Sequence, residues 1–175
     1  MGVKRGLDPH GRAGRPAACA VVTVSDTRGP RDDRSGDAVA RALTRAGHRV
    51  VSRAWVRDDV AGIRRAVRAA LARRAVDVVV LTGGTGIAPR DRTPEAVRPL
   101  LERELPGFGE RFRALSVRDV GSAAWLSRAG AGVARGRLIV WLPGATRAVA
   151  LAISRVAGPE LAHAIRLLER PETGA

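Results

Sequence analysis

One apolar run constrains the fold of this chain more than any other feature. Residues 75–82 read Ala-Val-Asp-Val-Val-Val-Leu-Thr and lead directly into the glycine loop Gly83-Gly-Thr-Gly86. Apart from Asp77, the run presents apolar or β-prone side chains to both faces of a sheet, which is typical of a central parallel strand. Parallel strands need crossover connections, and these place helices over the faces of the sheet. The run therefore predicts an α/β fold.

Short strands and amphipathic helical segments alternate along the rest of the chain. Further strands are predicted over residues 18–24, 48–56 and 137–142. Helices are predicted after Ser35, after Asp58-Asp59, from Thr93 to Leu101 with a break at Pro106-Gly107, and over residues 108–115, 146–156 and 160–168. Residues 122–132 are expected to be less regular. Four strands alternating with helices predict a three-layer αβα sandwich with a mostly parallel sheet.

The length of 175 residues is close to that of one folding unit. We expect a flexible basic tail over residues 1–17 and a single domain over residues 18–170. The tail has no apolar stretch like that of a signal peptide, and no apolar run reaches the roughly 18 residues of a membrane helix. We therefore expect a cytoplasmic protein without a membrane partner. The lone Cys19 and three scattered histidines indicate neither an internal disulfide nor a structural zinc site.

The net charge of +14 has two explanations. Lys4 is the only lysine among 31 basic residues, and Asn, Gln and Tyr are missing, so a biased composition could raise the charge without any functional demand. The alternative is an anionic partner, either a nucleic acid or a phosphorylated small molecule. The arginines are spread over many elements without the interleaved aromatic residues of single-strand binders, so we expect no nucleic-acid partner.

Three loops at the predicted carboxyl edge of the sheet carry the candidate chemistry, over residues 25–37, 82–94 and 143–147. In open α/β sheets ligands bind at this edge. The loop Gly83–Gly86 offers closely spaced backbone N–H groups that can cradle phosphate oxygens, although a tight turn would look the same. It is not a P-loop, because no Gly-Lys-Ser/Thr follows, and Pro89 breaks the dinucleotide fingerprint.

Two carboxylates accompany this loop. Asp91 lies between Arg90 and Arg92, where an ionised carboxylate suits a hard cation such as Mg²⁺ that bridges phosphate oxygens. Asp58 adds a second carboxylate to the same edge. The alternatives are an exposed salt bridge for Asp91 and a helix N-cap for Asp58. Segment 32–37, Ser127-Arg128 and Pro143-Gly144 each have an equally plain interpretation as loop, cap or turn, yet all would meet at one crevice.

Taken in the order in which they occur along the chain, the sequence motifs closely resemble those of the MoaB/Mog family of molybdenum cofactor biosynthesis, over roughly residues 18–168. The matching segments are Thr23-Val-Ser-Asp26, Asp33-Arg-Ser-Gly36, Leu81-Thr-Gly-Gly-Thr-Gly86, Pro89-Arg-Asp-Arg-Thr-Pro-Glu-Ala96, Pro106-Gly-Phe-Gly-Glu110, Leu126-Ser-Arg128 and Leu142-Pro-Gly144. Several linked motifs in the right order are far more specific than a single glycine loop.

The resemblance implies a three-layer αβα fold that assembles as a homo-oligomer, a trimer or a dimer of trimers. It also implies adenylyl transfer from Mg-ATP to the terminal phosphate of molybdopterin, with release of pyrophosphate. By the same resemblance Asp58 and Asp91 match the two essential carboxylates, as catalytic residues and Mg²⁺ ligands. The nucleotide and pterin pocket is matched by Ser25, Gly83, Gly84, Thr85, Gly86, Ser127, Arg128, Pro143 and Gly144.

A second interpretation is a molybdopterin-binding or carrier protein of the same pathway that does not catalyse a reaction. The segment Pro143–Ala148 is similar to the MoaB branch, some of whose bacterial members have no clear adenylyltransferase role, whereas Arg57-Asp58 carries the acid of active members. A subunit interface is expected around four large apolar residues, which are Phe108, Phe112, Leu115 and Trp125.

Overall fold

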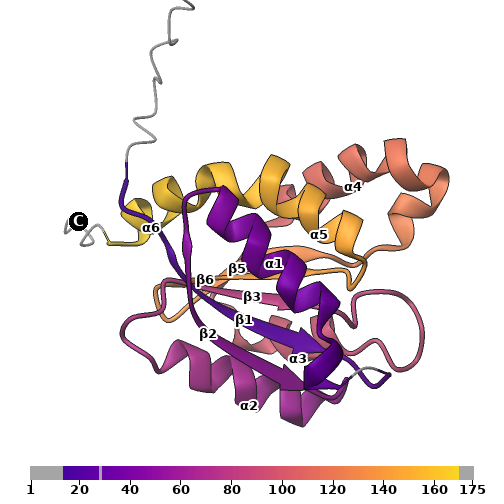
Figure 1. Ribbon diagram of the computed structural model, residues 1–175, viewed down its shortest axis with the longest axis horizontal. Helices are drawn as coiled ribbons and strands as arrows, with labels where there is room; N and C mark the ends of the chain where they lie inside the picture. The colour runs from indigo at the N-terminus through magenta and orange to yellow at the C-terminus, as the bar shows by residue number, and fades with distance from the viewer. Residues whose placement is uncertain (1–13, 28, 170–175) are drawn as a thin grey trace, which may run out of the picture.

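A six-stranded sheet lies between two layers of helices in the computed structural model of the chain, which describes residues 14–27 and 29–169 (Figure 1). The strand order is β2-β1-β3-β6-β5-β4. The four strands β2, β1, β3 and β6 are parallel, and β5 and β4 run antiparallel to their neighbours. The strands are β1 Ala18–Val24, β2 Arg49–Val56, β3 Val78–Thr82, β4 Arg103–Glu104, β5 Gly130–Ala134 and β6 Arg137–Leu142. The predicted three-layer sandwich is confirmed.

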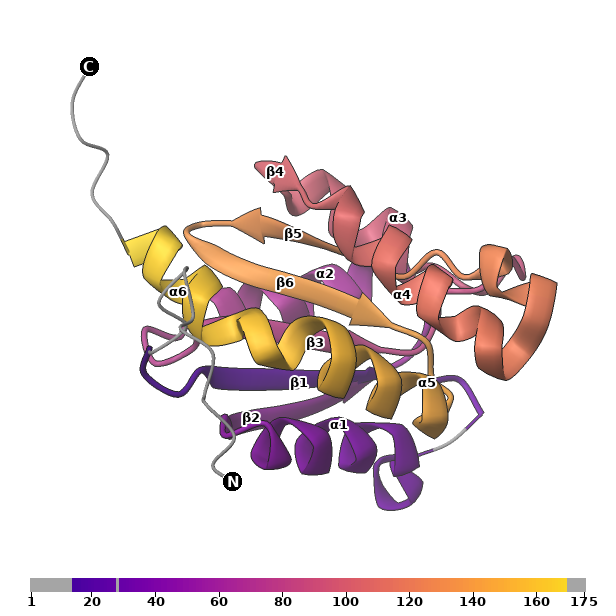
Figure 2. The same ribbon diagram turned by 90° about the horizontal axis from the view of Figure 1, so that it is seen from above.

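The helices divide between the two faces of the sheet. Figure 2 shows α1, α5 and α6 on one side of it, and Figure 1 shows α2 on the opposite side. The helices are α1 Arg34–Arg45, α2 Val60–Leu71, α3 Thr93–Val97, α4 Pro106–Val120, α5 Thr146–Ala152 and α6 Leu161–Glu169. Shorter helical turns are η1 Pro30–Asp32, η2 Arg98–Leu100, η3 Gly121–Leu126, the π-turn η4 Ile153–Ala157 and η5 Gly158–Glu160.

Strand β3 is buried on both faces, as its sequence predicts. Val78 and Val80 pack into the core beneath α1, α4 and the C-terminal helices, and Val79 and Leu81 pack into the core with α2 and α3. The strand begins at Val78 rather than at the predicted residue 75. Its sequence neighbour Asp77 instead uses its carboxylate to accept hydrogen bonds from Arg15 and from the backbone N–H of Ala18.

The helix caps correct one interpretation of the sequence. The N-cap of α1 is Asp33, whose carboxylate accepts from the N–H of Gly36 at 2.8 Å. The N-cap of α2 is Asp59, which accepts from the N–H of Gly62 at 2.7 Å. The N-cap role considered for Asp58 is therefore wrong. With Asp59 in that position, the side chain of Asp58 is available at the carboxyl edge of the sheet.

Strands β4 and β5 are not predicted by the sequence, which indicates an irregular stretch over residues 122–132. Two glycines in β5 explain the miss, because glycine has a low strand propensity. A Cβ atom on Gly130 would lie 2.3 Å from the ring of Trp141, and one on Gly132 would lie 2.7 Å from the carbonyl of Arg103. Close packing with both neighbouring strands thus requires these residues.

The region between Thr93 and Val120 also differs from the prediction. Helix α3 ends at Val97 instead of continuing to Leu101, because Pro99 falls in the following 3-10 turn η2. Pro106 does mark a boundary, but it begins α4, where a first-turn proline loses no hydrogen bond.

The two predicted C-terminal helices form one helical stretch, Thr146–Glu169, with a mean hydropathy of 1.2 in its most apolar window. Among the described residues it is the one stretch long and apolar enough to cross a membrane by length and composition. Its apolar side packs into the core through Val149, Ile153, Leu161 and Ile165. Core packing therefore accounts for part of its hydropathy, since 39% of the most apolar window is buried.

The ends of the chain bear on two predictions. Residues 1–13 lie outside the described residues, so the predicted tail over residues 1–17 stays a prediction. Arg15 already contacts Asp77, and the backbone N–H of Ala17 donates to Nδ1 of the buried His48 at 3.1 Å. Of the residues expected at a subunit interface, Phe112 is buried in the core of its own protomer, with its ring stacked against Phe108 at 6.4 Å. Trp125 is 73% exposed.

Candidate active site

The carboxyl ends of the four parallel strands lie side by side and bring three loops together. Thr23 in β1 pairs with Thr82 in β3, which pairs with Leu142 in β6. The N–H of Gly83 donates to the carbonyl of Leu142 at 2.9 Å, and the hydroxyl of Thr82 donates to the carbonyl of Pro143 at 3.0 Å. These bonds fix the starts of the loops that follow β3 and β6.

A cleft of about 380 Å³ opens at this edge. Six of the residues predicted from sequence line it, which are Ser25, Asp58, Gly83, Gly84, Asp91 and Gly144. The cleft therefore brings residues together that are more than 100 positions apart in the chain, from Ser25 to Gly144.

The first two glycines of the loop are required by backbone geometry. Gly83 and Gly84 have φ angles of +106° and +63°, which side chains other than that of glycine rarely allow. A Cβ atom on Gly83 would lie 2.0 Å from the carbonyl oxygen of Val24, and one on Gly84 would lie 2.4 Å from Oδ2 of Asp58. Thr93 holds this part of the loop, since its hydroxyl donates to the carbonyl of Gly83 at 2.8 Å and its N–H to that of Gly84 at 3.0 Å.

The two candidate carboxylates lie against the same glycine loop. Oδ2 of Asp58 is next to Gly84, and Oδ2 of Asp91 lies 2.6 Å from the position of a Cβ atom on Gly86. Oδ1 of Asp58 accepts from the N–H of Arg92 at 2.9 Å, and Oδ2 of Asp91 accepts from the N–H of Ala88 at 3.0 Å. Because carboxylates line the cleft, a bound phosphate would need a cation between itself and these side chains.

Electrostatics set Asp58 apart from an ordinary surface acid. Burial raises the pKa of Asp58, the hydrogen bond from the N–H of Arg92 lowers it, and the nearby charges of Asp91 and Asp26 raise it further, so the net shift is upward. The N–H of Asp58 also donates to the carboxylate of Asp26 at 3.0 Å. Within residues 14–27 and 29–169, Asp58 makes no salt bridge. A cation bound here would relieve the repulsion.

The donor set fits a cation that is shared with a ligand. In the described part of the chain, no group of three or more His, Cys, Asp and Glu side chains could hold a metal ion on its own. Mg²⁺ is commonly bound by one or two carboxylates, with substrate phosphates and water completing its octahedral shell. Asp58 and Asp91 can supply the protein's part of such a shell.

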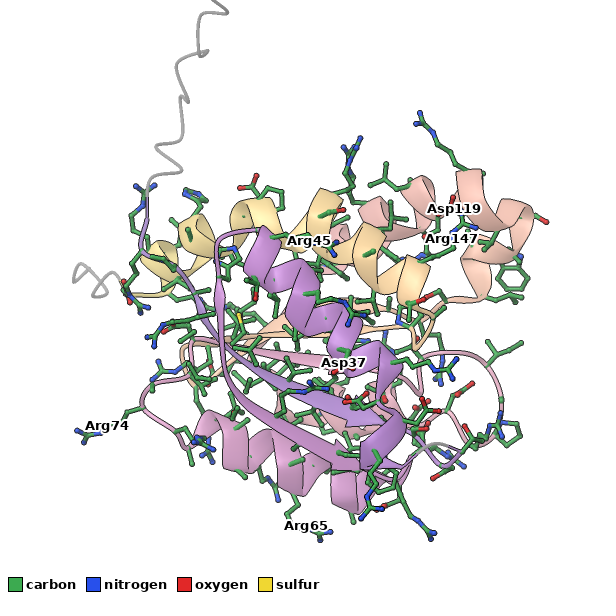
Figure 3. The ribbon with its side chains drawn as sticks, viewed as in Figure 1. Asp37, Arg45, Arg65, Arg74, Asp119 and Arg147 are labelled. Atoms are coloured by element: carbon green, nitrogen blue, oxygen red, sulfur yellow. The ribbon has the colours of Figure 1, made fainter. Side chains whose placement is uncertain are left out.

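A second cavity, of about 550 Å³, adjoins the first at Gly144 and Ala145. It lies between α4, η3 and the start of α5, and it contains the predicted residues Ser127 and Pro143. Asp119 and Arg147 line it from α4 and α5, with 3.9 Å between Oδ1 and Nη2 (Figure 3). The remaining lining is mostly apolar and includes Phe112, Val120, Ala123, Ala124, Ala148 and Leu151.

Three predicted residues, Thr85, Gly86 and Arg128, line neither cavity. Thr85 is buried, and the backbone carbonyl of Gly86 accepts a hydrogen bond from Nε of Arg128 at 2.7 Å. The guanidinium of Arg128 also donates to the carbonyl of Asp91 and to the carboxylate of Glu95. Its donors are thus engaged with the loop that carries Asp91.

Sequence reasoning did not assign several residues that line the cleft, namely Thr23, Asp26, Asp33, Ser35, Trp55 and Arg90. Most of them lie in the loops predicted at the carboxyl edge or in the sequence motifs named above, so their location could have marked them as candidate site residues. Asp33 carries several contacts at once, because it caps α1, accepts from the hydroxyl of Thr23 and pairs with Arg53. Trp55 has no such signal, since its place near the end of β2 marks it only as a strand residue.

Comparisons with known proteins agree with this geometry. A family profile described as "Probable molybdopterin binding domain" matches residues 20–163. The molybdenum cofactor biosynthesis protein B of Halalkalibacterium halodurans is 46% identical over 155 residues, covering 88% of this chain and 91% of that protein. A crystal structure of molybdenum cofactor biosynthesis protein B has a TM-score of 0.87 at 44% identity, covering 91% of this chain and 99% of that one.

A crystal structure of the tungsten cofactor synthesizing protein MoaB from Pyrococcus furiosus has a TM-score of 0.81 at 36% identity, covering 90% of this chain and 100% of that one. The chain therefore belongs to the molybdopterin-binding domains and, among them, to the MoaB/Mog family of molybdenum cofactor biosynthesis proteins. The resemblance seen in the sequence motifs is confirmed.

Proposed function

We propose that this protein transfers the adenylyl group of Mg-ATP to molybdopterin. A terminal phosphate oxygen of molybdopterin attacks the α-phosphorus of ATP, a new P–O bond forms, and the bond from the α-phosphorus to the bridging oxygen of the β-phosphate breaks. Pyrophosphate leaves with that oxygen and its electron pair. The observation that carries the proposal is the pair Asp58 and Asp91, which lie against one glycine loop in one cleft.

The residues of the cleft have the properties that such a transfer needs. Phosphoryl-type transfer depends mainly on positioning and on neutralising the phosphate charge. Asp58 and Asp91 would hold the Mg²⁺ that neutralises the phosphates, and Arg90 lines the same cleft. The attacking phosphate is already anionic, so a general base is not required. This agrees with the lack of histidine among the described residues that line the cleft.

The adjoining cavity supports a reaction with two substrates. The polar cleft and the mostly apolar cavity share Gly144 and Ala145, so two ligands could meet there. Pro143, Gly144 and Ser127 would then contact substrate at the junction.

The test is to incubate the purified chain with molybdopterin, ATP and Mg²⁺ and to look for adenylylated molybdopterin by chromatography. We expect product from the wild type and none from Asp91→Ala. A wild type that binds both substrates and forms no product would contradict the proposal. Equal turnover by Asp91→Ala would contradict the assigned role of the carboxylate.

The second candidate is a molybdopterin-binding or carrier protein without turnover. The similarity to proteins of the MoaB type and the segment Pro143–Ala148 favour it. The same experiment separates the two functions. A carrier would bind molybdopterin tightly, form no product with ATP and Mg²⁺, and bind no less tightly after Asp91→Ala.

We also propose that the protein assembles as a homo-oligomer, either a trimer or a dimer of trimers. Val117, Val120 and Trp125 are 52%, 55% and 73% exposed on α4 and η3, although such residues are usually covered. Light scattering should give a mass of three or six chains. A monomer mass at micromolar concentration would contradict this proposal.

A further inference from the structure

Arg128 makes an unusual set of contacts for a residue beside a nucleotide cleft. Its Nε donates to the carbonyl of Gly86 at 2.7 Å, its Nη2 donates to the carbonyl of Asp91 at 2.7 Å, and its Nη1 pairs with the carboxylate of Glu95. One planar guanidinium therefore joins both ends of the segment 86–91 to the first turn of α3.

The backbone of Arg128 is itself firmly held. Its N–H donates to the carbonyl of Thr85 at 2.8 Å, and its carbonyl accepts from Nε1 of Trp141 at 2.8 Å. Trp141 is fully buried in β6. The guanidinium thus projects from a loop that is bonded to the sheet through Trp141, and the side chain of Arg128 is only 29% exposed.

Glu95 orients the guanidinium. Burial acts to raise the pKa of Glu95, but the hydrogen bond and the charge of Arg128 outweigh it, and the pKa is lowered. The carboxylate therefore stays ionised and keeps its pair with Arg128 at neutral pH. Arg128 and Glu95 together form a clamp on segment 86–91.

The segment 83–91, which contains the glycine loop, has two halves that are held by different residues. Thr93 holds Gly83 and Gly84 through two hydrogen bonds. Arg128 holds Gly86 and Asp91. That half also has two hydrogen bonds between Ala88 and Asp91, and the N–H of Arg92 next to it donates to Asp58. Loss of Arg128 should therefore loosen Asp91 and leave Gly83 and Gly84 in place.

We propose that Arg128, oriented by Glu95, is a positioning residue that fixes Asp91 for Mg²⁺ binding and does not itself bind the nucleotide. This inference rests on the proposed function, because it assigns Asp91 to the cation. It gives Arg128 a different role from the direct pocket contact that the family resemblance implies. Partners that orient metal ligands typically contribute about 10- to 100-fold to metal affinity.

The geometry also explains why arginine is needed. A planar fork can donate in three directions at once, whereas the ammonium of lysine is a point charge on a flexible stem. Arg128→Lys keeps the positive charge but cannot span Gly86, Asp91 and Glu95 in the same way. The lysine variant therefore separates a clamp from a simple electrostatic contact with phosphate.

The experiment is calorimetric titration of the full chain with ATP, once with Mg²⁺ and once with a chelator in place of the metal. The variants are Arg128→Ala, Arg128→Lys and Glu95→Gln. The matched control is Arg15→Ala, because the guanidinium of Arg15 also donates three hydrogen bonds, to Asp77 and Glu169, and these lie at the opposite ends of the strands from segment 86–91. Melting temperatures of all variants show that each one folds.

We expect Arg128→Ala and Arg128→Lys to weaken Mg-ATP binding by about tenfold or more, with metal-free ATP binding changed less than twofold. Glu95→Gln should weaken Mg-ATP binding by a few fold, and Arg15→Ala should bind like the wild type. Equal weakening of metal-free and Mg-bound ATP in Arg128→Ala, with rescue by Arg128→Lys, would overturn the inference, because it would show a direct charge contact. Identical behaviour of Arg128→Ala and Arg15→Ala would also overturn it.

A second measurement separates this inference from the proposed function. If the wild type binds no ATP, the proposed function fails, and backbone amide exchange decides the role of Arg128. Faster exchange at Ala88, Asp91 and Arg92 in Arg128→Ala than in Arg15→Ala would support the clamp. Equal exchange in the two variants would overturn it.

Discussion

One notable aspartate, Asp77, lies at the amino ends of the parallel strands, here called the amino edge, and another, Asp58, lies at the carboxyl edge. The two carboxylates have opposite electrostatic surroundings. At the amino edge, Asp77 forms a two-pronged pair with Arg15, at 2.7 and 2.8 Å, and accepts from the N–H of Ala18. Burial acts to raise the pKa of Asp77, but these hydrogen bonds outweigh it, and the pKa is lowered. At the carboxyl edge, Asp58 has acidic neighbours and no salt bridge within the described residues, and its pKa is raised.

We propose that this difference separates a structural carboxylate from a functional one. Asp77 has its charge neutralised by the chain itself, so it contributes to stability. Asp58 keeps a charge that the chain does not neutralise, and perturbed acids of this kind concentrate at functional sites. The contrast predicts that Asp58 is needed for activity and slightly weakens the fold, whereas Asp77 stabilises the fold and is not needed for activity.

The largest expected effect is on activity. Asp58→Asn should lower adenylyl transfer at least about 100-fold, because it removes a carboxylate that we propose as a ligand of Mg²⁺. Asp77→Asn should retain wild-type turnover per folded molecule, since it lies at the opposite edge of the sheet. Product formation at saturating substrate measures both. Similar losses in the two variants would remove the distinction between the edges.

The next effect concerns the glycine loop. Gly84→Ala should lower the free energy of unfolding by roughly 3 kcal/mol, since it combines a positive φ with a clash against Asp58. Gly136→Ala is the matched control, because Gly136 has a φ of +66° and open space around it. It should cost only about 1 kcal/mol. Urea unfolding measures both variants, and equal losses would show that backbone strain alone fixes Gly84.

A smaller effect is expected on the stability provided by Asp77. Asp77→Asn should lower the free energy of unfolding by roughly 2 kcal/mol at neutral pH, because hydrogen bonds to a charged group are lost. Asp58→Asn should raise stability slightly, since a charge that weakens the fold disappears. Urea unfolding at pH 7 makes this comparison. A destabilised Asp58→Asn would show that Asp58 is structural too.

The two aspartates should also respond to pH with opposite sign. The folded pKa of Asp77 is lowered, so its contribution is present above the unfolded value of about 3.9 and is lost as the pH falls through the folded value. The folded pKa of Asp58 is raised, so its ionised form weakens the fold above that pKa, and the penalty vanishes below about 3.9. Unfolding of wild type and both variants between pH 3 and 7 tests the signs.

The smallest effect concerns Cys19 in β1, which lies near Asp77. Burial and the charge of Asp77 raise the pKa of its thiol to about 12. We expect no reaction with a thiol reagent at neutral pH until the chain unfolds, because only the thiolate is the nucleophile. Rapid labelling of the folded protein would show that the amino edge opens easily.

The sequence predicts the parts of the fold that rest on apolar patterning. Strands β1 and β6 have the predicted bounds, and β3 is central and buried on both faces. Strands β4 and β5 could not be predicted, because Gly130 and Gly132 are required by packing against Trp141 and Arg103, which are distant in the sequence. Local propensity carries no trace of those contacts.

The candidate site was predictable to a similar degree. The rule that ligands bind at the carboxyl edge is sufficient to bring Ser25, Asp58, Gly83, Asp91 and Gly144 to one cleft. It cannot tell which donors the fold already uses. Asp59, rather than Asp58, caps α2, and this could not be read from two adjacent aspartates. The contacts of Arg128 depend likewise on side-chain directions that the sequence does not contain.

The most direct test of the contrast between the edges is a carbon-13 NMR titration of the aspartate carboxyl groups, without and with Mg²⁺ and ATP. We expect Asp58 to titrate above the ordinary value of about 3.9 and to fall when Mg²⁺ and ATP are added, while Asp77 titrates below that value and does not move. An Asp58 carboxyl that titrates at or below the ordinary value, and that ignores Mg²⁺ and ATP, would contradict the assignment of the carboxyl edge as the cation-binding site.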